Sequence, residues 1–201
     1  MEKLQSLRSN TIYLRLALSL SGLFFVVTGI QYWLPDYMTN VLLVDQETVG
    51  WYYSFLSFTA PISGVITSGI LTTRFGGYNT LKSQYMQCCM GICAVLSALP
   101  IPWIPGSHFQ VFAIFIWLLL FFGGFILPPM TGIMLNSVSE YQRTSANSLA
   151  NMCYNLFGYA PAPLFYGLIS KISGGDTSRW PMGCLLYSTI FTIYCFLSAM
   201  R

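Results

Sequence analysis

Long apolar stretches separated by short polar connections dominate this chain. Each of six stretches holds about 20 predominantly apolar residues, the length that a helix needs to cross the hydrocarbon core of a bilayer. A β-barrel is disfavoured, because its strands alternate apolar and polar residues over about ten positions. The pattern predicts an all-α membrane protein with one six-helix domain over residues 1–201, and the predicted spans are residues 14–37, 49–72, 81–99, 109–135, 145–172 and 182–200.

Composition supports the same class. Of the 201 residues, 55% are hydrophobic and only 7% are Asp, Glu, Lys or Arg, whereas charged residues make up about a quarter of a soluble domain. A soluble fold with so few charges could not cover its surface. Because six spans and short loops use nearly the whole chain, we expect no domain outside the membrane and no binding of nucleic acid.

The charged residues separate onto two sides when the chain is threaded through six spans. One side receives Lys3, Arg8, Arg15, Arg74, Lys82, Arg143 and Arg201, and the other receives Lys171, Arg179, Asp36, Asp45, Glu47 and Asp176. Lys and Arg collect at the cytoplasmic ends of membrane helices. The asymmetry therefore predicts both termini on the cytoplasmic side, or on the matrix side of an organelle membrane, and a first loop over residues 36–47 on the other side.

The string GILTTRFGG follows the second predicted span, at residues 69–77. It resembles the G-x-L-x-D-R-x-G-R signature that major facilitator superfamily transporters carry after the second helix of each six-helix half. Gly69, Leu71, Arg74 and Gly76 match the signature, and Phe75 occupies one of its variable positions. Thr73 stands where the signature has Asp, and Gly77 where it has Arg. Glycine at position 69 allows a close helix approach, Gly76 a tight reversal, and Arg74 a charge at the membrane surface. The alternative is an ordinary basic loop that obeys the orientation rule.

Two further strings carry the resemblance. Residues 140–147, with Glu140 and Arg143, lead into a segment with glycine and proline near its middle, which is similar to the approach to helix eleven of the superfamily. The stretch TGIQYWLP at residues 28–35 resembles the seventh helix of spinster-like transporters. The resemblance implies half of a major facilitator superfamily fold, namely the C-terminal six-helix half, with spinster-like or organic-anion-type relatives.

Span five carries a polar stripe. Asn147, Asn151 and Asn155 recur at four-residue spacing, Tyr159 continues the line and Tyr154 lies beside it. Residues four apart share one face of a helix, so this stripe should avoid lipid. It is suited to line a water-filled path, where Asn151, Tyr154 and Asn155 would contact a solute. The alternative is hydrogen bonding to a neighbouring helix, a common contact within membranes.

The first span gathers polar and aromatic groups near its outer end. Thr28, Gln31 and Tyr32 supply a hydroxyl, an amide and a phenol there, and they are candidates for contact with an amphipathic solute. Tyr32 could equally anchor the helix at the membrane interface, where Tyr and Trp are enriched.

Prolines interrupt two predicted spans. Pro128 lies within span four, behind Gly123 and Gly124, and Pro161 lies within span five. Irregular helix at membrane depth is tolerated only against protein or a cavity, and interrupted helices point to a transporter's binding site. A moving or cavity-lining role is expected, against fixed kinks as the alternative.

The centres of the spans hold no Asp, Glu, Lys, Arg or His, so no proton-coupling carboxylate is evident. The six cysteines have neither paired CxxC spacing nor a His neighbour. No pattern for a metal site, a cofactor or nucleophilic catalysis is present, so we expect neither a metal nor a cofactor, and no enzyme.

The resemblance implies transport of a small organic or amphipathic solute by alternating access, in a cavity between two six-helix halves. One half supplies one wall, so the lipid bilayer and a second half are the expected partners. The second half could be a separate chain, a missing N-terminal half or a copy of this chain. The alternative function is that of an accessory or structural subunit in a larger membrane complex.

Overall fold

The computed structural model describes residues 10–175 and 177–200, and helices make up almost all of this part. The long helices are α2 (Thr11–Asn40), α3 (Gln46–Arg74), α4 (Leu81–Ala98), α5 (Phe109–Asn136) and α8 (Trp180–Ala199); α6 (Arg143–Tyr154), the π-helical turn η4 (Asn155–Tyr159) and α7 (Pro161–Ile172) form one interrupted rod. Three short 3₁₀ turns, η1 (Ile101–Trp103), η2 (Gly106–His108) and η3 (Glu140–Gln142), lie in connections. Each rod begins and ends within three residues of a predicted span.

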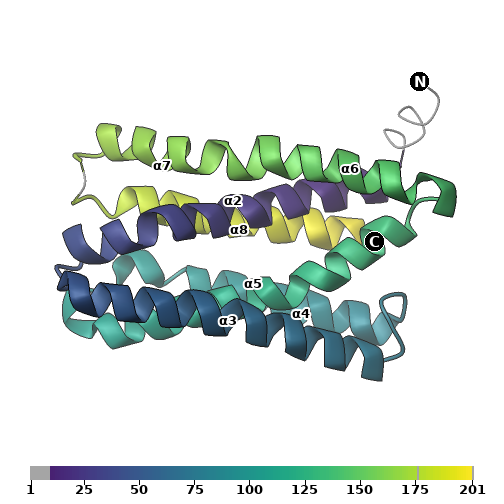
Figure 1. The fold of residues 1–201 in the computed structure, drawn as a ribbon, viewed down its shortest axis with the longest axis horizontal. Helices are drawn as coiled ribbons and strands as arrows, with labels where there is room; N and C mark the ends of the chain where they lie inside the picture. Colours follow the sequence, from purple (N-terminus) through teal and green to yellow (C-terminus); the bar gives the residue numbers. More distant parts are fainter. Residues whose placement is uncertain (1–9, 176, 201) are drawn as a thin grey trace.

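The rods run side by side and reverse direction at each connection (Figure 1). The rod of α6 and α7 forms one edge of the bundle, α3 and α4 form the opposite edge, and α2 and α8 lie between them. The start of α2 and the end of α8 meet at the same end of the bundle, where the Arg15 guanidinium donates a hydrogen bond to the carbonyl of Ser198.

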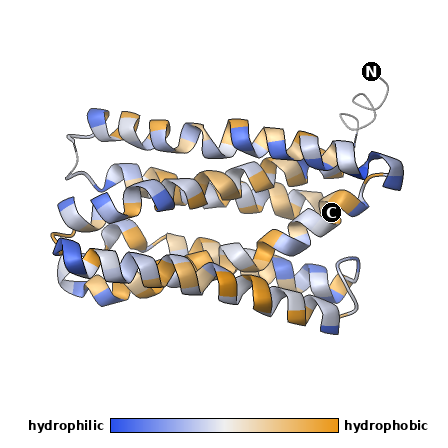
Figure 2. Cartoon of the chain, in the orientation of Figure 1, coloured by the Kyte–Doolittle hydropathy of each residue, from blue (hydrophilic) through white to orange (hydrophobic). Residues whose placement is uncertain are grey.

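Five helical segments of the described chain are long and apolar enough to cross a membrane. They contain α2, α3, α4, α5 and α8, and Figure 2 shows apolar residues along their length. The all-helical class predicted from the sequence is confirmed. The rod of α6 and α7 is divided by its π-helical turn and bears hydrophilic residues along α6 (Figure 2), so its role as a sixth span stays a prediction.

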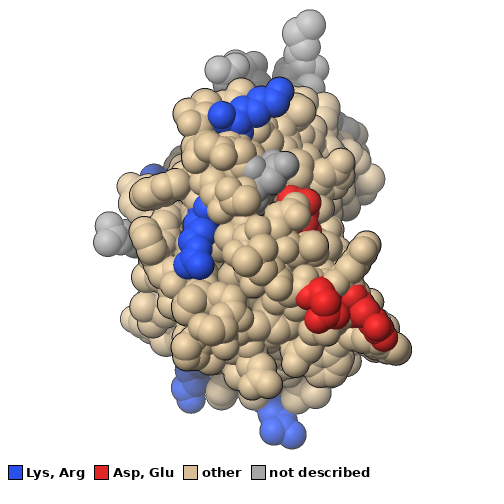
Figure 3. Space-filling model, turned by 90° about the vertical axis from the view of Figure 1, so that its left-hand side faces the viewer, with Lys and Arg blue, Asp and Glu red and all other residues tan. Residues whose placement is uncertain are grey.

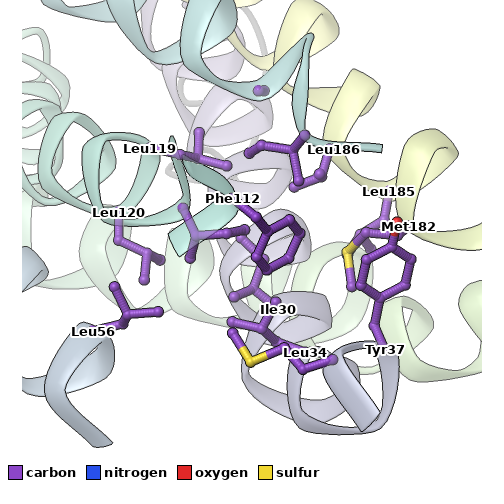
Figure 4. Packing of buried hydrophobic residues seen from close by; sticks show 14 of the residues in the cluster. Ile30, Leu34, Tyr37, Leu56, Phe112, Leu119, Leu120, Met182, Leu185 and Leu186 are labelled. Carbon is purple, nitrogen blue, oxygen red and sulfur yellow. The ribbon is translucent and has the colours of Figure 1, made fainter. Parts of the chain in front are cut away.

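The core is filled by side chains from helices that are distant in the sequence. Figure 4 shows Phe112 of α5 among apolar side chains of α2 and α8, and its ring lies 5.8 Å from that of Tyr37. Leu34, Phe112 and Leu186 have no exposed surface. The core therefore ties the middle of the bundle together across three helices.

Helix α3 packs against α5 more extensively than against its sequence neighbour α4. Glycines make this close approach possible: Gly64 of α3 lies against the carbonyl of Phe121, and a Cβ added to Gly124 of α5 would lie 2.7 Å from the carbonyl oxygen of Pro61. Small residues at such crossings let two membrane helices pack backbone to backbone.

The predicted first loop over residues 36–47 is wrong in its extent. Helix α2 continues to Asn40, whose side-chain amide donates to the Asp36 carboxylate one turn earlier at 2.8 Å. Helix α3 then begins at Gln46, behind an N-cap at Asp45. The connection is short because both polar ends fold as helix, with side chains that satisfy each other or the helix terminus.

Proline affects the two interrupted segments differently. Helix α5 stays continuous through Pro128 and Pro129, and Figure 1 shows its C-terminal part turning towards α6. Proline lacks an N–H, so Pro128 leaves the carbonyl of Gly124 without its usual helical donor. In the other rod α6 ends at Tyr154, and α7 starts at Pro161 after the π-helical turn, a feature that often marks functional sites.

Candidate functional site

One face of α6 is buried and the adjacent face is polar. Ala146, Ala150, Tyr154 and Gly158 recur every four residues and are buried, whereas the asparagines that each follow one position later, Asn147, Asn151 and Asn155, are exposed. The rod can approach α2 closely because Gly158 has no side chain: a Cβ there would lie 2.7 Å from the carbonyl oxygen of Ser21. The asparagine stripe therefore lies directly beside the contact with α2.

The asparagine side chains bond to their own helix. The Asn151 amide donates to the Asn147 carbonyl at 2.9 Å, and the Asn155 amide donates to the Asn151 carbonyl at 2.7 Å. These bonds do not reach a neighbouring helix of the described chain, so the stripe does not hold α6 to α2. Its exposed amide oxygens remain available to water, a solute or another protein.

Thr28, Gln31 and Tyr32 lie on α2 at the border between α3 and the rod of α6 and α7. Gln31 is exposed, and its backbone carbonyl accepts a hydrogen bond from the Tyr53 hydroxyl of α3 at 2.9 Å. Tyr32 is 64% exposed, and its ring meets Trp33 edge to face at 5.2 Å. The Thr28 hydroxyl is buried and has no hydrogen-bond partner among the described residues.

Phe24 joins these residues of α2 to the asparagine stripe. Its ring centre lies 4.8 Å from that of Tyr154 and 4.9 Å from that of Tyr159, one helical turn before Thr28. Tyr159 continues the asparagine stripe, so the stripe and the Thr28 side of α2 border the same aromatic stack. We call Thr28, Gln31, Tyr32, Asn147, Asn151 and Asn155 the polar face. Tyr154 itself is only 9% exposed and packs beneath this face.

The residues of the GILTTRFGG string lie apart from the polar face, at the end of the bundle that holds the α3–α4 connection (Figure 1). Gly76 and Gly77 have φ angles of 88° and 93°, so the reversal uses conformations that favour glycine. Gly69 lies on an open side of α3, where a Cβ would meet nothing within 4 Å. Arg74 is exposed in the last turn of α3, beside the negative end of its dipole.

Arg143 begins α6 at the same end of the bundle. Its guanidinium lies 3.7 Å from the carboxylate of Glu140, an exposed pair three residues apart. Exposed pairs of this kind contribute little to stability. The Nε atom of Arg143 is buried and has no hydrogen-bond partner among the described residues.

The described charges divide between the two ends of the bundle. One end, which we call the basic end, holds Arg15, Arg74, Lys82, Arg143 and Glu140. The other, which we call the acidic end, holds Asp36, Asp45, Glu47, Lys171 and Arg179, and Figure 3 shows its acidic and basic side chains in separate places. Lys3, Arg8, Asp176 and Arg201 lie outside the described residues. The pKa of the Asp45 carboxyl is lowered, because the backbone N–H and the side chain of Thr48 donate to it at the start of α3.

The structure also contains a pocket that the sequence did not reveal. A hollow of about 330 Å³ lies at the acidic end of the bundle, between the α4–α5 connection and the start of α8, and it is lined by Pro102, Trp103, Ser173, Ser178, Arg179, Trp180, Gly183 and Tyr187. From the sequence, Arg179 was assigned only to one side of the membrane by its charge, and to no binding site. The two tryptophans that follow polar or proline-rich loops were the available signal.

One small internal void and the cysteines offer little chemistry. A void of about 30 Å³ lies between α2, α4, α5 and α8, lined mainly by apolar residues. Within residues 10–175 and 177–200, no group of three His, Cys, Asp or Glu side chains is placed to hold a metal ion. The six cysteines are unpaired.

Part of the chain is similar to a known protein family. Residues 106–173, about a third of the sequence, match the family model described as the Organic Anion Transporter Polypeptide (OATP) family. The match covers α5 and the whole rod of α6 and α7, with Pro128, Asn151, Asn155 and Pro161. The comparison of the chain with curated proteins gives no match.

This match confirms the predicted resemblance to solute carriers of the major facilitator type, and it names the organic-anion-type relatives that the sequence suggested. The OATP family is a family of transporters, not of enzymes. Together with the five apolar helical segments, the match shows a multi-pass integral membrane protein.

Proposed function

We propose that the chain is one six-helix half of a solute transporter, and that the polar face forms one wall of the solute path. The observation that carries this proposal is the exposure of Asn151 in the last turn of α6 and of Asn155 at the start of the π-helical turn. Asparagine in contact with lipid is unfavourable, and irregular helix at membrane depth is tolerated only against protein or water. A water-filled cavity next to the rod satisfies both requirements.

The solute class follows from the matched family. We propose a small organic anion with an apolar part, in keeping with the description of that family. Tyr32, Tyr159 and Phe24 supply aromatic surface, and Gln31 and the asparagines supply amides. The described polar face holds no Lys or Arg, so the compensating positive charge would come from the second half of the transporter.

Alternating access requires that second half. The rod of α6 and α7 packs mainly on α2 and α8. The asparagines, Gln31 and Tyr32 of the polar face are left exposed by the described chain, whereas the Thr28 hydroxyl is buried. We propose that a second six-helix bundle covers the polar face, and that the π-helical turn lets the rod bend while the two halves rock. The basic end of the bundle would face the cytoplasm, with both chain termini on that side.

The test is flux of an organic anion, with fluorescein as the probe, into vesicles that contain the transporter. Asn151→Leu combined with Asn155→Leu should lower the initial rate at least tenfold, because two amides are lost from the path while the helix and its apolar contacts are kept. Asn151→Gln combined with Asn155→Gln keeps the amides and should retain most of the flux.

The matched control is Met152→Leu combined with Leu156→Met, which changes the next exposed position after each asparagine without changing polarity. It should transport like the unmodified protein. Equal flux in the leucine pair and the control would reject the solute path along α6.

The competing function is an accessory subunit whose polar face is covered by fixed protein. The self-bonded asparagine amides are compatible with such packing, because a buried face needs its donors satisfied. Single cysteines at positions 151 and 155, in a protein whose six native cysteines are replaced by alanine, separate the two functions. A water-lined path exposes both positions to a membrane-impermeant maleimide, and a permanent protein contact protects them.

A further inference from the structure

The pocket at the acidic end of the bundle is lined by aromatic rings of defined orientation. Trp103 of η1 and Trp180 of α8 meet edge to face, with ring centres 6.1 Å apart and planes at 82°. Tyr187 holds one of them: the Trp103 indole N–H donates to the Tyr187 hydroxyl at 2.7 Å, which donates in turn to the Leu99 carbonyl at 3.3 Å. The two indoles therefore form two adjacent walls of the pocket, nearly at right angles to each other.

Hydrogen-bond donors gather at the other side of the same pocket. The Arg179 guanidinium donates one long hydrogen bond, 3.4 Å to the carbonyl of Trp103, and keeps further N–H groups for a ligand. The Ser173 hydroxyl is buried without a hydrogen-bond partner among the described residues, and Ser178 lines the same wall. Helix α8 also begins here, and the positive end of its dipole favours an anion. Its first N–H groups contribute little, because the Trp180 N–H donates to the Ser178 hydroxyl at 3.4 Å and Pro181 has no N–H.

The pocket lies at one end of the apolar bundle, where lipid headgroups are expected. It is formed where α8 starts and where the α4–α5 connection turns, at the end of five membrane-length segments. Trp103 is 63% exposed and Trp180 is 60% exposed, and tryptophan is enriched at the boundary between acyl chains and headgroups. The pocket has a volume of about 330 Å³, which is at the lower end of the range for small-ligand pockets, roughly 300–1,000 Å³.

We propose that this pocket binds the phosphocholine headgroup of a membrane phospholipid. Arginine pairs with phosphate oxygens through its planar fork of donors, so Arg179 and the Ser173 hydroxyl hold the phosphate. The faces of aromatic rings attract quaternary ammonium groups, so Trp103 and Trp180 hold the choline. The acyl chains then run along the apolar outside of the bundle. The site lies outside the polar face and does not depend on the proposed solute path.

The test counts bound lipid on the purified transporter by native mass spectrometry, with dihexanoylphosphatidylcholine as the probe. Arg179→Gln and Trp180→Leu should each weaken binding about tenfold, as expected for loss of a charge-assisted hydrogen bond or a desolvated cation–π contact. Lys171→Gln and Trp51→Leu are the matched controls, since they remove the same kinds of side chain from the same end of the bundle, outside the pocket. Both controls should bind the lipid like the unmodified protein.

Further ligands identify which part of the lipid is recognised. Dihexanoylphosphatidylglycerol, which lacks the ammonium group, should bind at least fivefold more weakly, and inorganic phosphate should not displace the choline lipid at equal concentration. Equal binding of the two lipids would overturn the aromatic cage, and displacement by inorganic phosphate would mean that the pocket takes a free anion. Loss of binding in the controls as well, or in no variant, would overturn the site, and thermal unfolding of each variant shows that the bundle is intact.

Discussion

The adjacent glycines of α5 give a sharp test of how the bundle is packed. Gly123 and Gly124 are neighbours in one helix, but a Cβ added to Gly123 would meet nothing within 4 Å, whereas a Cβ added to Gly124 would lie 2.7 Å from the carbonyl oxygen and 3.0 Å from the Cα of Pro61 in α3. Heavy atoms in good contact are about 3.5–4.0 Å apart. Gly124→Ala should therefore push α3 and α5 apart, and Gly123→Ala should not.

The expected magnitudes follow from two opposing effects. Overpacking costs about 1–3 kcal/mol, and the upper part of this range applies at Gly124 because the opposing atoms belong to a backbone. Replacing a helical glycine by alanine recovers about 0.5–1 kcal/mol. Gly124→Ala should thus lose about 2 kcal/mol of stability and Gly123→Ala should gain up to about 1 kcal/mol, a difference of about 3 kcal/mol.

Thermal unfolding in mild detergent, followed by circular dichroism at 222 nm, measures this difference. At about 2–4 °C per kcal/mol for a chain of this size, the two variants should unfold roughly 6–12 °C apart, with Gly124→Ala below and Gly123→Ala at or above the unmodified protein. Equal unfolding temperatures would refute the close approach of α3 and α5. So would a larger loss in Gly123→Ala.

Three further predictions test other contacts of the bundle. Gly158→Ala should lower the unfolding temperature by several degrees, because its Cβ would lie 2.7 Å from the Ser21 carbonyl oxygen, whereas Gly167→Ala, with its nearest atom at 3.9 Å, should not. Gly77→Ala should lose about 1–2 kcal/mol in the same unfolding assay, because φ is 93° there; Gly50→Ala, in open helix, is its control. The lowered pKa of Asp45 means that its cap contributes stability above the carboxyl's ordinary pKa of about 3.9, and this contribution disappears as pH falls through the lower folded-state value. Unfolding temperatures between pH 6 and pH 2 should therefore fall more steeply for the unmodified protein than for Asp45→Asn, which keeps an uncharged acceptor for the Thr48 N–H; parallel curves would contradict the cap.

The sequence by itself determined the helices and most of their ends. Apolar runs of membrane length, proline and glycine between them, and caps such as Asp45 act within a few residues, because helical hydrogen bonds join positions only four apart. The same locality explains the failure at residues 36–47, where the acidic residues suggested a loop, but Asp36 is satisfied by Asn40 inside the helix. The asparagine stripe was equally readable, since four-residue spacing is a property of one helix.

Only the tertiary structure decided which helices touch. Nothing in the spacing of Gly64 and Gly124 indicates that α3 packs on α5 rather than on α4, because that choice depends on the shapes of surfaces far apart in the chain. The same holds for the π-helical turn against α2, and for the pocket in which Trp103, Arg179 and Tyr187 meet across more than 75 residues of sequence. Local hydrogen bonding specifies a helix, but a binding site arises where side chains from several helices converge, and that convergence exists only in the packed bundle.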